Sequence, residues 1–194
     1  LTACVAKLCL ITCAAIGAFP GAAVDAAVVV NQKSTFGSAP IGNQEEEKFY
    51  YFTFEKIKSG TLPPGWGVAS GKGKWGITGK SSFNGANSVK FVRADKLADD
   101  PGVCLVQAKH LRFSNIDVTA QVRLIDAMPG DGAGIVWSYV DDKNFYNLEY
   151  KQNGIIDVYR TTKGKRQLLV SVVSKKDSEK KWAKLRVVHL GSRI

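Results

Sequence analysis

The chain has few of the side chains that most often carry metal or redox chemistry. Its 194 residues include only 4 cysteines, 2 histidines and 1 methionine. His110 and His189 lie far apart, and no Ser or Cys motif accompanies either of them. Nothing in their spacing indicates a metal centre or a catalytic triad. We therefore expect no bound metal and no cofactor.

Long apolar runs are also absent, except at the N-terminus. There Lys7 precedes an apolar run over residues 8–19, and small residues follow as far as Ala26. This order is typical of a secretory signal peptide. We predict residues 1–26 to be removed after Ala26, with Ala23 as the alternative, and the protein to be secreted or periplasmic; a lipoprotein is a minor alternative. No later stretch approaches the ~18 apolar residues of a membrane span, so we expect no transmembrane segment.

Cleavage at that point would leave Cys104 as the single cysteine, which excludes an internal disulfide in the mature chain. The apolar neighbours of Cys104 predict a strand, and therefore a buried and unreactive thiol. Residues 27–48 contain no motif and are predicted to be a leader or linker. Residues 49–194 are predicted to form one domain.

Helical periodicity is missing from this domain, whereas strand patterns recur between turn residues. Residues 116–124 alternate strictly between apolar and polar, which predicts one buried face and one face in water. Further strands are predicted over 49–54, 133–140, 144–150, 155–161, 166–173 and 184–190. Asn153-Gly154 is typical of a type I′ hairpin turn. The sequence therefore predicts an all-β protein, either a sandwich or a barrel.

Two acidic residues on the predicted strands, Glu149 and Asp157, are candidates for catalysis, because glycoside hydrolysis needs two carboxylates at the scissile bond. The Glu-x-Asp-x-x-Glu spacing of jelly-roll endoglucanases is absent, and solvent-facing positions are the simpler expectation for both. Trp75, Tyr139 and Tyr146 either stack on sugar rings or pack in the core. A Gly-rich match to G-x-G-x-x-G ends at Gly76, but a strand follows it, so we interpret it as a turn.

The charge is one-sided, with 27 Lys and Arg against 17 Asp and Glu and a formal net charge of +10. Such an excess attracts anionic partners. For an exported chain without a nucleic-acid-binding motif we expect no nucleic acid as partner. The alternatives are a merely solvated basic surface and an acidic or sulfated glycan.

Several segments together resemble secreted bacterial domains of the concanavalin A-like lectin/glucanase superfamily, in particular the 3-keto-disaccharide hydrolase-like (3-keto-glucoside lyase/hydratase) group. The segments are Gly132-Ala133-Gly134-Ile135-Val136-Trp137-Ser138-Tyr139, Asn144-Phe145-Tyr146, Val158-Tyr159-Arg160, Gly164-Lys165-Arg166-Gln167-Leu168-Leu169 and Trp182-x-x-Leu185-Arg186-Val187. The resemblance implies a two-sheet antiparallel jelly roll whose concave face handles carbohydrate. It also implies further strands after Ile194, so we expect the sandwich to be incomplete in this chain.

The sequence leaves two hypotheses for function. In the first, the domain acts on glycosides, with Glu149 or Asp157 as the acid/base and Arg160 orienting the substrate. Members of the group often carry Asn-Ser-Gly-Ile with an Arg three residues after the Ile, where this chain has Ser138. In the second, the domain is a non-catalytic glycan-binding or cell-surface module with Trp75, Tyr139 and Tyr146 as stacking residues. Carbohydrate is the expected partner in both, and a monomer the expected state.

Overall fold

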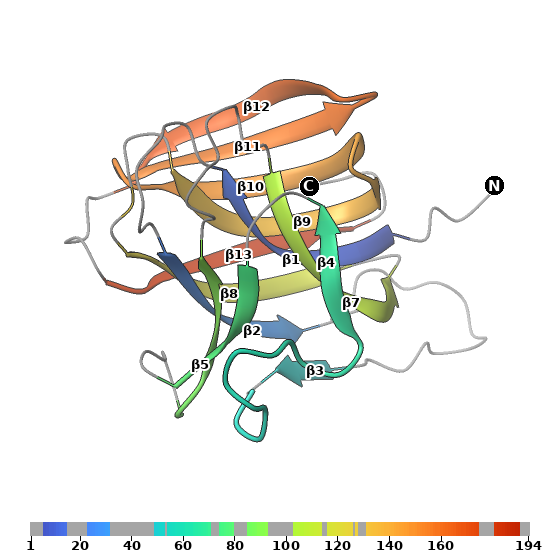
Figure 1. Ribbon diagram of the computed structural model, residues 1–194. Helices are drawn as coiled ribbons and strands as arrows, with labels where there is room; N and C mark the ends of the chain where they lie inside the picture. Colours follow the sequence, from blue (N-terminus) through green and yellow to red (C-terminus); the bar gives the residue numbers. More distant parts are fainter. Residues whose placement is uncertain are drawn as a thin grey trace, which may run out of the picture.

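The computed structural model describes residues 6–14, 23–31, 49–52, 54–70, 74–79, 85–92, 103–113, 116–125, 127, 131–174 and 181–190 (Figure 1). In these residues the protein consists of thirteen strands and no helix. No helix in the described part of the chain could cross a membrane. The prediction of an all-β protein is therefore confirmed.

The strands form two antiparallel sheets (Figure 1). In spatial order, the seven-stranded sheet contains β12 (Lys165–Val173), β11 (Ile155–Thr162), β10 (Asn144–Lys151), β9 (Gly132–Asp141), β1 (Ala6–Ala14), β7 (Val103–Phe113) and β4 (Trp66–Ser70). The six-stranded sheet contains β13 (Ala183–His189), β8 (Ile116–Ile125), β2 (Ala23–Asn31), β6 (Ser88–Val92) and β5 (Lys74–Thr78), with β3 (Phe49–Phe52) paired to β2. This pairing is consistent with a β-sandwich.

The strand β8 has the alternation that its sequence predicts. Its even-numbered residues, from Ile116 to Leu124, are all at most 8% exposed and belong to one apolar core. Leu185 and Val187 of β13 join them from the neighbouring strand, and β9 and β5 supply further members. Burying a Val, Leu or Ile side chain contributes about 1.5–3 kcal/mol, so this cluster is the main stabilising element among the described residues. The core residues drawn from these four strands are Ile116, Val118, Ala120, Val122, Leu124, Leu185, Val187, Ala133, Ile135, Trp137, Trp75 and Ile77.

Strands β9 to β12 follow one another as an antiparallel meander, joined by tight turns. The turn between β10 and β11 differs from the predicted type I′. Gly154 has a positive φ of 82°, but Asn153 does not, and its side chain accepts a hydrogen bond from the Ile155 N–H. The loop has three residues, which is the length of a type I turn closed by a left-handed glycine. Positive φ angles at two consecutive residues, 51° and 77°, occur instead at Lys163 and Gly164, between β11 and β12.

The N-terminal segment is paired into both sheets. Strand β1 lies between β9 and β7, and β2 lies between β8 and β6. The predicted signal peptide thus includes all of β1 and the first part of β2, while its removal stays a prediction. Cys104 lies on β7 opposite Cys13 of β1, and its predicted burial falls outside the described side chains.

Candidate functional site

The two candidate acids, Glu149 and Asp157, lie directly opposite each other on β10 and β11. Successive side chains of a strand point to opposite faces of the sheet. Leu148 and Val158 pack against the core, so both carboxylates belong to the other face. Even so, Glu149 is 0% exposed and Asp157 only 4% exposed. The expectation that both acids face solvent is therefore wrong.

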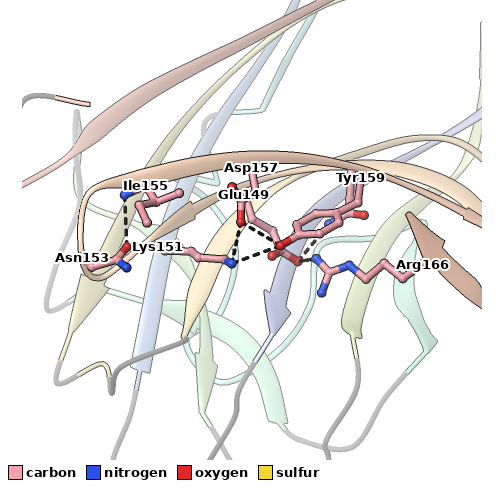
Figure 2. Close-up of polar contacts among 8 residues, drawn as sticks. Glu149, Lys151, Asn153, Ile155, Asp157, Tyr159 and Arg166 are labelled. Carbon is pink, nitrogen blue, oxygen red and sulfur yellow. Dashed lines mark hydrogen bonds and ion pairs between the residues drawn. The ribbon is translucent and has the colours of Figure 1, made fainter. Parts of the chain in front are cut away.

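Polar side chains from three neighbouring strands lie together on this face, and we call them the polar row; Figure 2 labels every member except Asn147. The members of the polar row are Asn147, Glu149 and Lys151 of β10, Asp157 and Tyr159 of β11, and Arg166 of β12. Period-two spacing places the members from β10 and β11 on one face, and Arg166 reaches them from the adjacent strand.

The first half of the polar row is centred on Glu149. Its Oε1 atom lies 2.5 Å from Nη2 of Arg166 and accepts a hydrogen bond of 2.9 Å from Nδ2 of Asn147. The Arg166 side chain is 34% exposed, whereas that of Glu149 is fully covered. The guanidinium therefore lies between the carboxylate and solvent.

The second half is centred on Asp157, whose Oδ2 atom has two partners. It lies 2.6 Å from Nζ of Lys151 and accepts a hydrogen bond of 2.7 Å from the Tyr159 hydroxyl. The Tyr159 oxygen in turn accepts a bond of 3.1 Å from Lys151. The Arg166 guanidinium carbon lies 3.6 Å from the centroid of the Tyr159 ring, and this contact joins the two halves into one network.

This network shifts the pKa values of its second half. Burial raises the pKa of the Asp157 carboxyl, but hydrogen bonds from Lys151, Ser171 and Tyr159 outweigh burial, and the net pKa is lowered. Burial lowers the pKa of Lys151, yet its bonds to Asp157 and Tyr159 leave it raised. The pKa of Tyr159 is raised, chiefly by burial and then by its bond to Asp157. The first two shifts favour an Asp157 carboxylate and a Lys151 ammonium near neutral pH, and the third favours a protonated Tyr159 hydroxyl.

Four buried polar atoms on this face have no hydrogen-bond partner. They are Oδ1 of Asn147, Oε2 of Glu149, Oδ1 of Asp157 and Oγ1 of Thr161. Thr161 belongs to the same face because it follows Tyr159 by two residues on β11. A buried polar group without a partner costs about 1–3 kcal/mol, so four on one face require an explanation. Groups of a ligand that donate hydrogen bonds would satisfy them.

Glycine at position 134 brings the β9 backbone close to this face. Gly134 is the β9 residue opposite Glu149, and a Cβ atom placed there would overlap the carbonyl oxygen of Leu148. No side chain larger than hydrogen fits without moving β10. Gly134 therefore helps to set the position of Glu149, which the sequence motif alone did not indicate.

An irregularity in β9 brings an aromatic ring toward this face. The pairing of β9 and β10 changes register between Asn144 and Tyr146, and Ser138 has a positive φ of 49°. Beyond this point the Tyr139 ring lies 6.1 Å from that of Phe145, which shares the face of Asn147. Both rings are buried, and neither belongs to the core cluster between the sheets. Tyr139 is thus the predicted stacking residue that contacts a ring on the face of the polar row.

The other predicted binding residues lie elsewhere. Trp75 is 5% exposed within the core, on the six-stranded sheet. Tyr146 packs against the core and stacks on Trp137 at 5.7 Å. Arg160 is exposed and lies 5.8 Å from the Tyr146 ring, on the opposite face from Asp157. Packing accounts for Trp75 and Tyr146, and the structure separates Arg160 from the two carboxylates.

Asn147, Lys151, Tyr159 and Arg166 belong to the polar row but were not selected from the sequence. Their spacing contained a usable signal, because Asn147, Glu149 and Lys151 occupy alternate positions on β10. The same alternation relates Asp157 to Tyr159 on β11. Arg166 joins the polar row only because β12 pairs with β11. Alternation within a single strand does not reveal such pairing.

Among the described residues, no group of three or more His, Cys, Asp or Glu side chains has an arrangement suited to a metal ion. Comparisons with protein-family models, curated proteins and solved structures found no match for this chain. The family resemblance stays a prediction, and the function has to be argued from the polar row.

Proposed function

We propose that the protein binds a saccharide at the polar row. The observation that carries this proposal is the group of unpartnered buried atoms on Asn147, Glu149, Asp157 and Thr161. Three of these atoms are oxygens that only accept hydrogen bonds, and sugar hydroxyls are good donors. Hydroxyls also accept hydrogen bonds, which suits the cationic donors Lys151 and Arg166 at the more exposed side of the row.

The charge balance of the polar row favours a neutral sugar. Its two carboxylates are each paired with one cation, Glu149 with Arg166 and Asp157 with Lys151. An acidic sugar would have to compete with these carboxylates for their partners, and removing one partner of a buried pair is costly. An acidic glycan is the alternative suggested by the net charge of +10.

Glycoside hydrolysis or elimination is the second candidate, and the opposed pair of Glu149 and Asp157 favours it. Directly opposite residues of adjacent strands have Cβ atoms about 4.5–5.5 Å apart, and retaining glycosidases hold their carboxyl groups about 5–5.5 Å apart. A general acid, however, needs a raised pKa, whereas the pKa of Asp157 is lowered. Binding therefore has stronger support than catalysis.

The finer features of the fold belong to the same proposal. We propose that the two sheets form a concanavalin A-like jelly roll with the polar row on its concave face, in a protein that acts as an exported monomer. The antiparallel pairing of both sheets supports this arrangement. Export can be tested directly by N-terminal sequencing of protein collected outside the cytoplasm. A mature N-terminus at residue 27 supports it, and an exported chain that retains β1 contradicts cleavage after Ala26.

The binding proposal is tested by screening the protein against neutral and acidic glycans and measuring affinity for any hit by calorimetry. The informative variant is Glu149→Gln, which keeps the side-chain volume and removes an acceptor. We expect it to weaken binding about tenfold or more. Asp117→Asn, at an ion pair on the six-stranded sheet, is the matched control and should leave affinity unchanged. Equal affinity for both variants, or no hit in the whole panel, would contradict the proposal.

Catalysis is tested separately with Glu149→Gln and with a further variant, Asp157→Asn. The protein is incubated with oxidised and unoxidised disaccharides, and the products are analysed. If the second candidate is correct, the unmodified protein should turn over a disaccharide, and Glu149→Gln and Asp157→Asn should each abolish this turnover. A ligand that binds without turnover leaves the protein as a glycan-binding module.

A further inference from the structure

The edge strand β12 is unusual among the strands whose side chains the structure describes, because all nine of its residues are exposed. Five of them are Leu or Val, with exposed fractions between 42% and 82%. They are Leu168, Leu169, Val170, Val172 and Val173. The strand at the other edge of the same sheet, β4, has five residues, and among its described side chains Val68 is the single exposed large apolar one.

Within the described residues, β12 pairs with β11 on one side only. Its outer edge therefore presents backbone N–H and C=O groups with none of the described strands beside them. Soluble proteins usually protect such an edge with charges, with proline or by shortening the strand. Between Gln167 and Val173 this strand has no charged residue and no proline. Its composition, rich in Val and Leu, is also well suited to strand pairing.

Among the described residues, basic side chains lie at one end of this edge. Lys143, Lys163 and Lys165 are all exposed around the turn that leads into β12, and Arg160 is exposed beside Gln167. Asp141 and Asp142 are exposed nearby, and the Asp141 carboxylate already accepts bonds from the Lys143 N–H and the Asn144 side chain. Four cations against two carboxylates leave this end basic. At the other end, Val173 is 82% exposed.

We propose that β12 binds an extended segment of a partner protein, which adds one strand to the seven-stranded sheet. The segment would carry alternating apolar side chains and an acidic group at the end that lies beside Lys163 and Lys165. Backbone hydrogen bonds would supply affinity, and the basic end would set the direction of the added strand. The net charge of +10 would also accelerate association with an acidic partner.

Two other occupants fit the observations less well. A second copy of this chain paired antiparallel about Leu169 would place Lys165 opposite Val173, so its basic ends would find no acidic counterpart. Both copies would also carry the same charge of +10. A lipid surface could cover the apolar side chains, but it cannot supply the row of donors and acceptors that a strand edge needs.

The test uses two labelled nine-residue peptides that alternate valine and threonine, one ending in two aspartates and the other in two lysines. Fluorescence anisotropy should show tighter binding of the aspartate peptide, by about tenfold. Val170→Lys and Val172→Lys should each weaken that binding about tenfold or more, because a charge is placed within the added interface. Val68→Lys is the matched control, since Val68 is 47% exposed and Val170 is 50% exposed.

The charge component is tested with Lys163→Glu combined with Lys165→Glu, which should reverse the preference between the two peptides. Lys184→Glu, at an exposed position of β13, should not. Hydrogen exchange should show protection of β12 amides only with the aspartate peptide. Equal binding of both peptides by all variants would overturn the proposal. Dimerisation of the protein that Val170→Lys abolishes would also overturn it. A third contrary result would be binding to anionic phosphatidylserine vesicles that depends on Val170, with no binding of either peptide.

Discussion

Each sheet contains an ion pair between an arginine and a carboxylate, and the two pairs have similar nitrogen–oxygen distances but different surroundings. On the six-stranded sheet, Arg186 contacts Asp117 through two hydrogen bonds of 2.8 and 2.6 Å. On the seven-stranded sheet, Arg166 lies 2.5 Å from Glu149. The Arg186 side chain is 60% exposed and that of Arg166 is 34% exposed. Both carboxylate oxygens of Asp117 have partners, whereas Oε2 of Glu149 has none.

This difference distinguishes an ion pair whose carboxylate oxygens both have partners, Asp117 with Arg186, from the polar row, in which some acceptors have none. The bidentate pair of Asp117 and Arg186 joins neighbouring strands and leaves neither carboxylate oxygen unpartnered. The polar row buries charges and leaves acceptors unfilled, which costs free energy that a purely structural contact would not need to spend. Unfilled hydrogen-bonding capacity, rather than the mere presence of charge, is therefore the feature that makes the polar row the candidate site.

The largest expected effect comes from removing one arginine from each sheet. Arg166→Leu leaves Glu149 buried without its cation, so the free energy of unfolding should fall by about 3 kcal/mol or more. Arg186→Leu should cost less, because the Arg186 guanidinium is 60% exposed and its pairing is partly screened by solvent, although the Asp117 side chain is only 10% exposed. Urea denaturation measures both. Similar losses in the two variants would remove the distinction between the two pairs.

A smaller effect is expected from adding a methyl group beside each sheet. Gly134→Ala would force the new Cβ into the Leu148 carbonyl next to Glu149, and should cost about 1–3 kcal/mol. Gly76→Ala on β5 brings a Cβ to 3.0 Å from the Gly60 backbone, a milder overlap that should cost less. Thermal unfolding gives the ranking. If Gly76→Ala is the more damaging, then close backbone approach does not single out the polar row.

The smallest expected effect is a dependence of stability on pH. Because the folded pKa of Asp157 lies below its unfolded value, its contribution to stability is present above the ordinary aspartate pKa of about 3.9 and is lost as the pH falls through the lowered folded pKa. Asp157→Asn should therefore flatten the acid limb of a plot of unfolding free energy against pH. An acid limb identical to that of the unmodified protein would show that Asp157 does not contribute to it.

Local patterns predicted much of the strand layout. Alternation over 116–124 located β8 and its buried face. The turn residues located the first and last residues of each strand from β9 to β12 to within about two residues. Prediction failed where more than one strand is involved. Tyr139 lies near Phe145 because the register shifts within the pairing of β9 and β10, and Asn153 lacks the positive φ of a type I′ turn because the loop has three residues.

For this protein, the sequence by itself determined the all-β class, the period-two faces and the tight turns of the meander, because these depend on neighbouring residues along one chain. The tertiary structure decided which faces meet. It placed Glu149 opposite Asp157, brought Arg166 from a third strand over both Glu149 and Tyr159, and buried Trp75 in the core. The physical reason is that strand pairing is a long-range event: its register, set by hydrogen bonds between strands and by packing of the two sheets, leaves no periodic trace within any single strand.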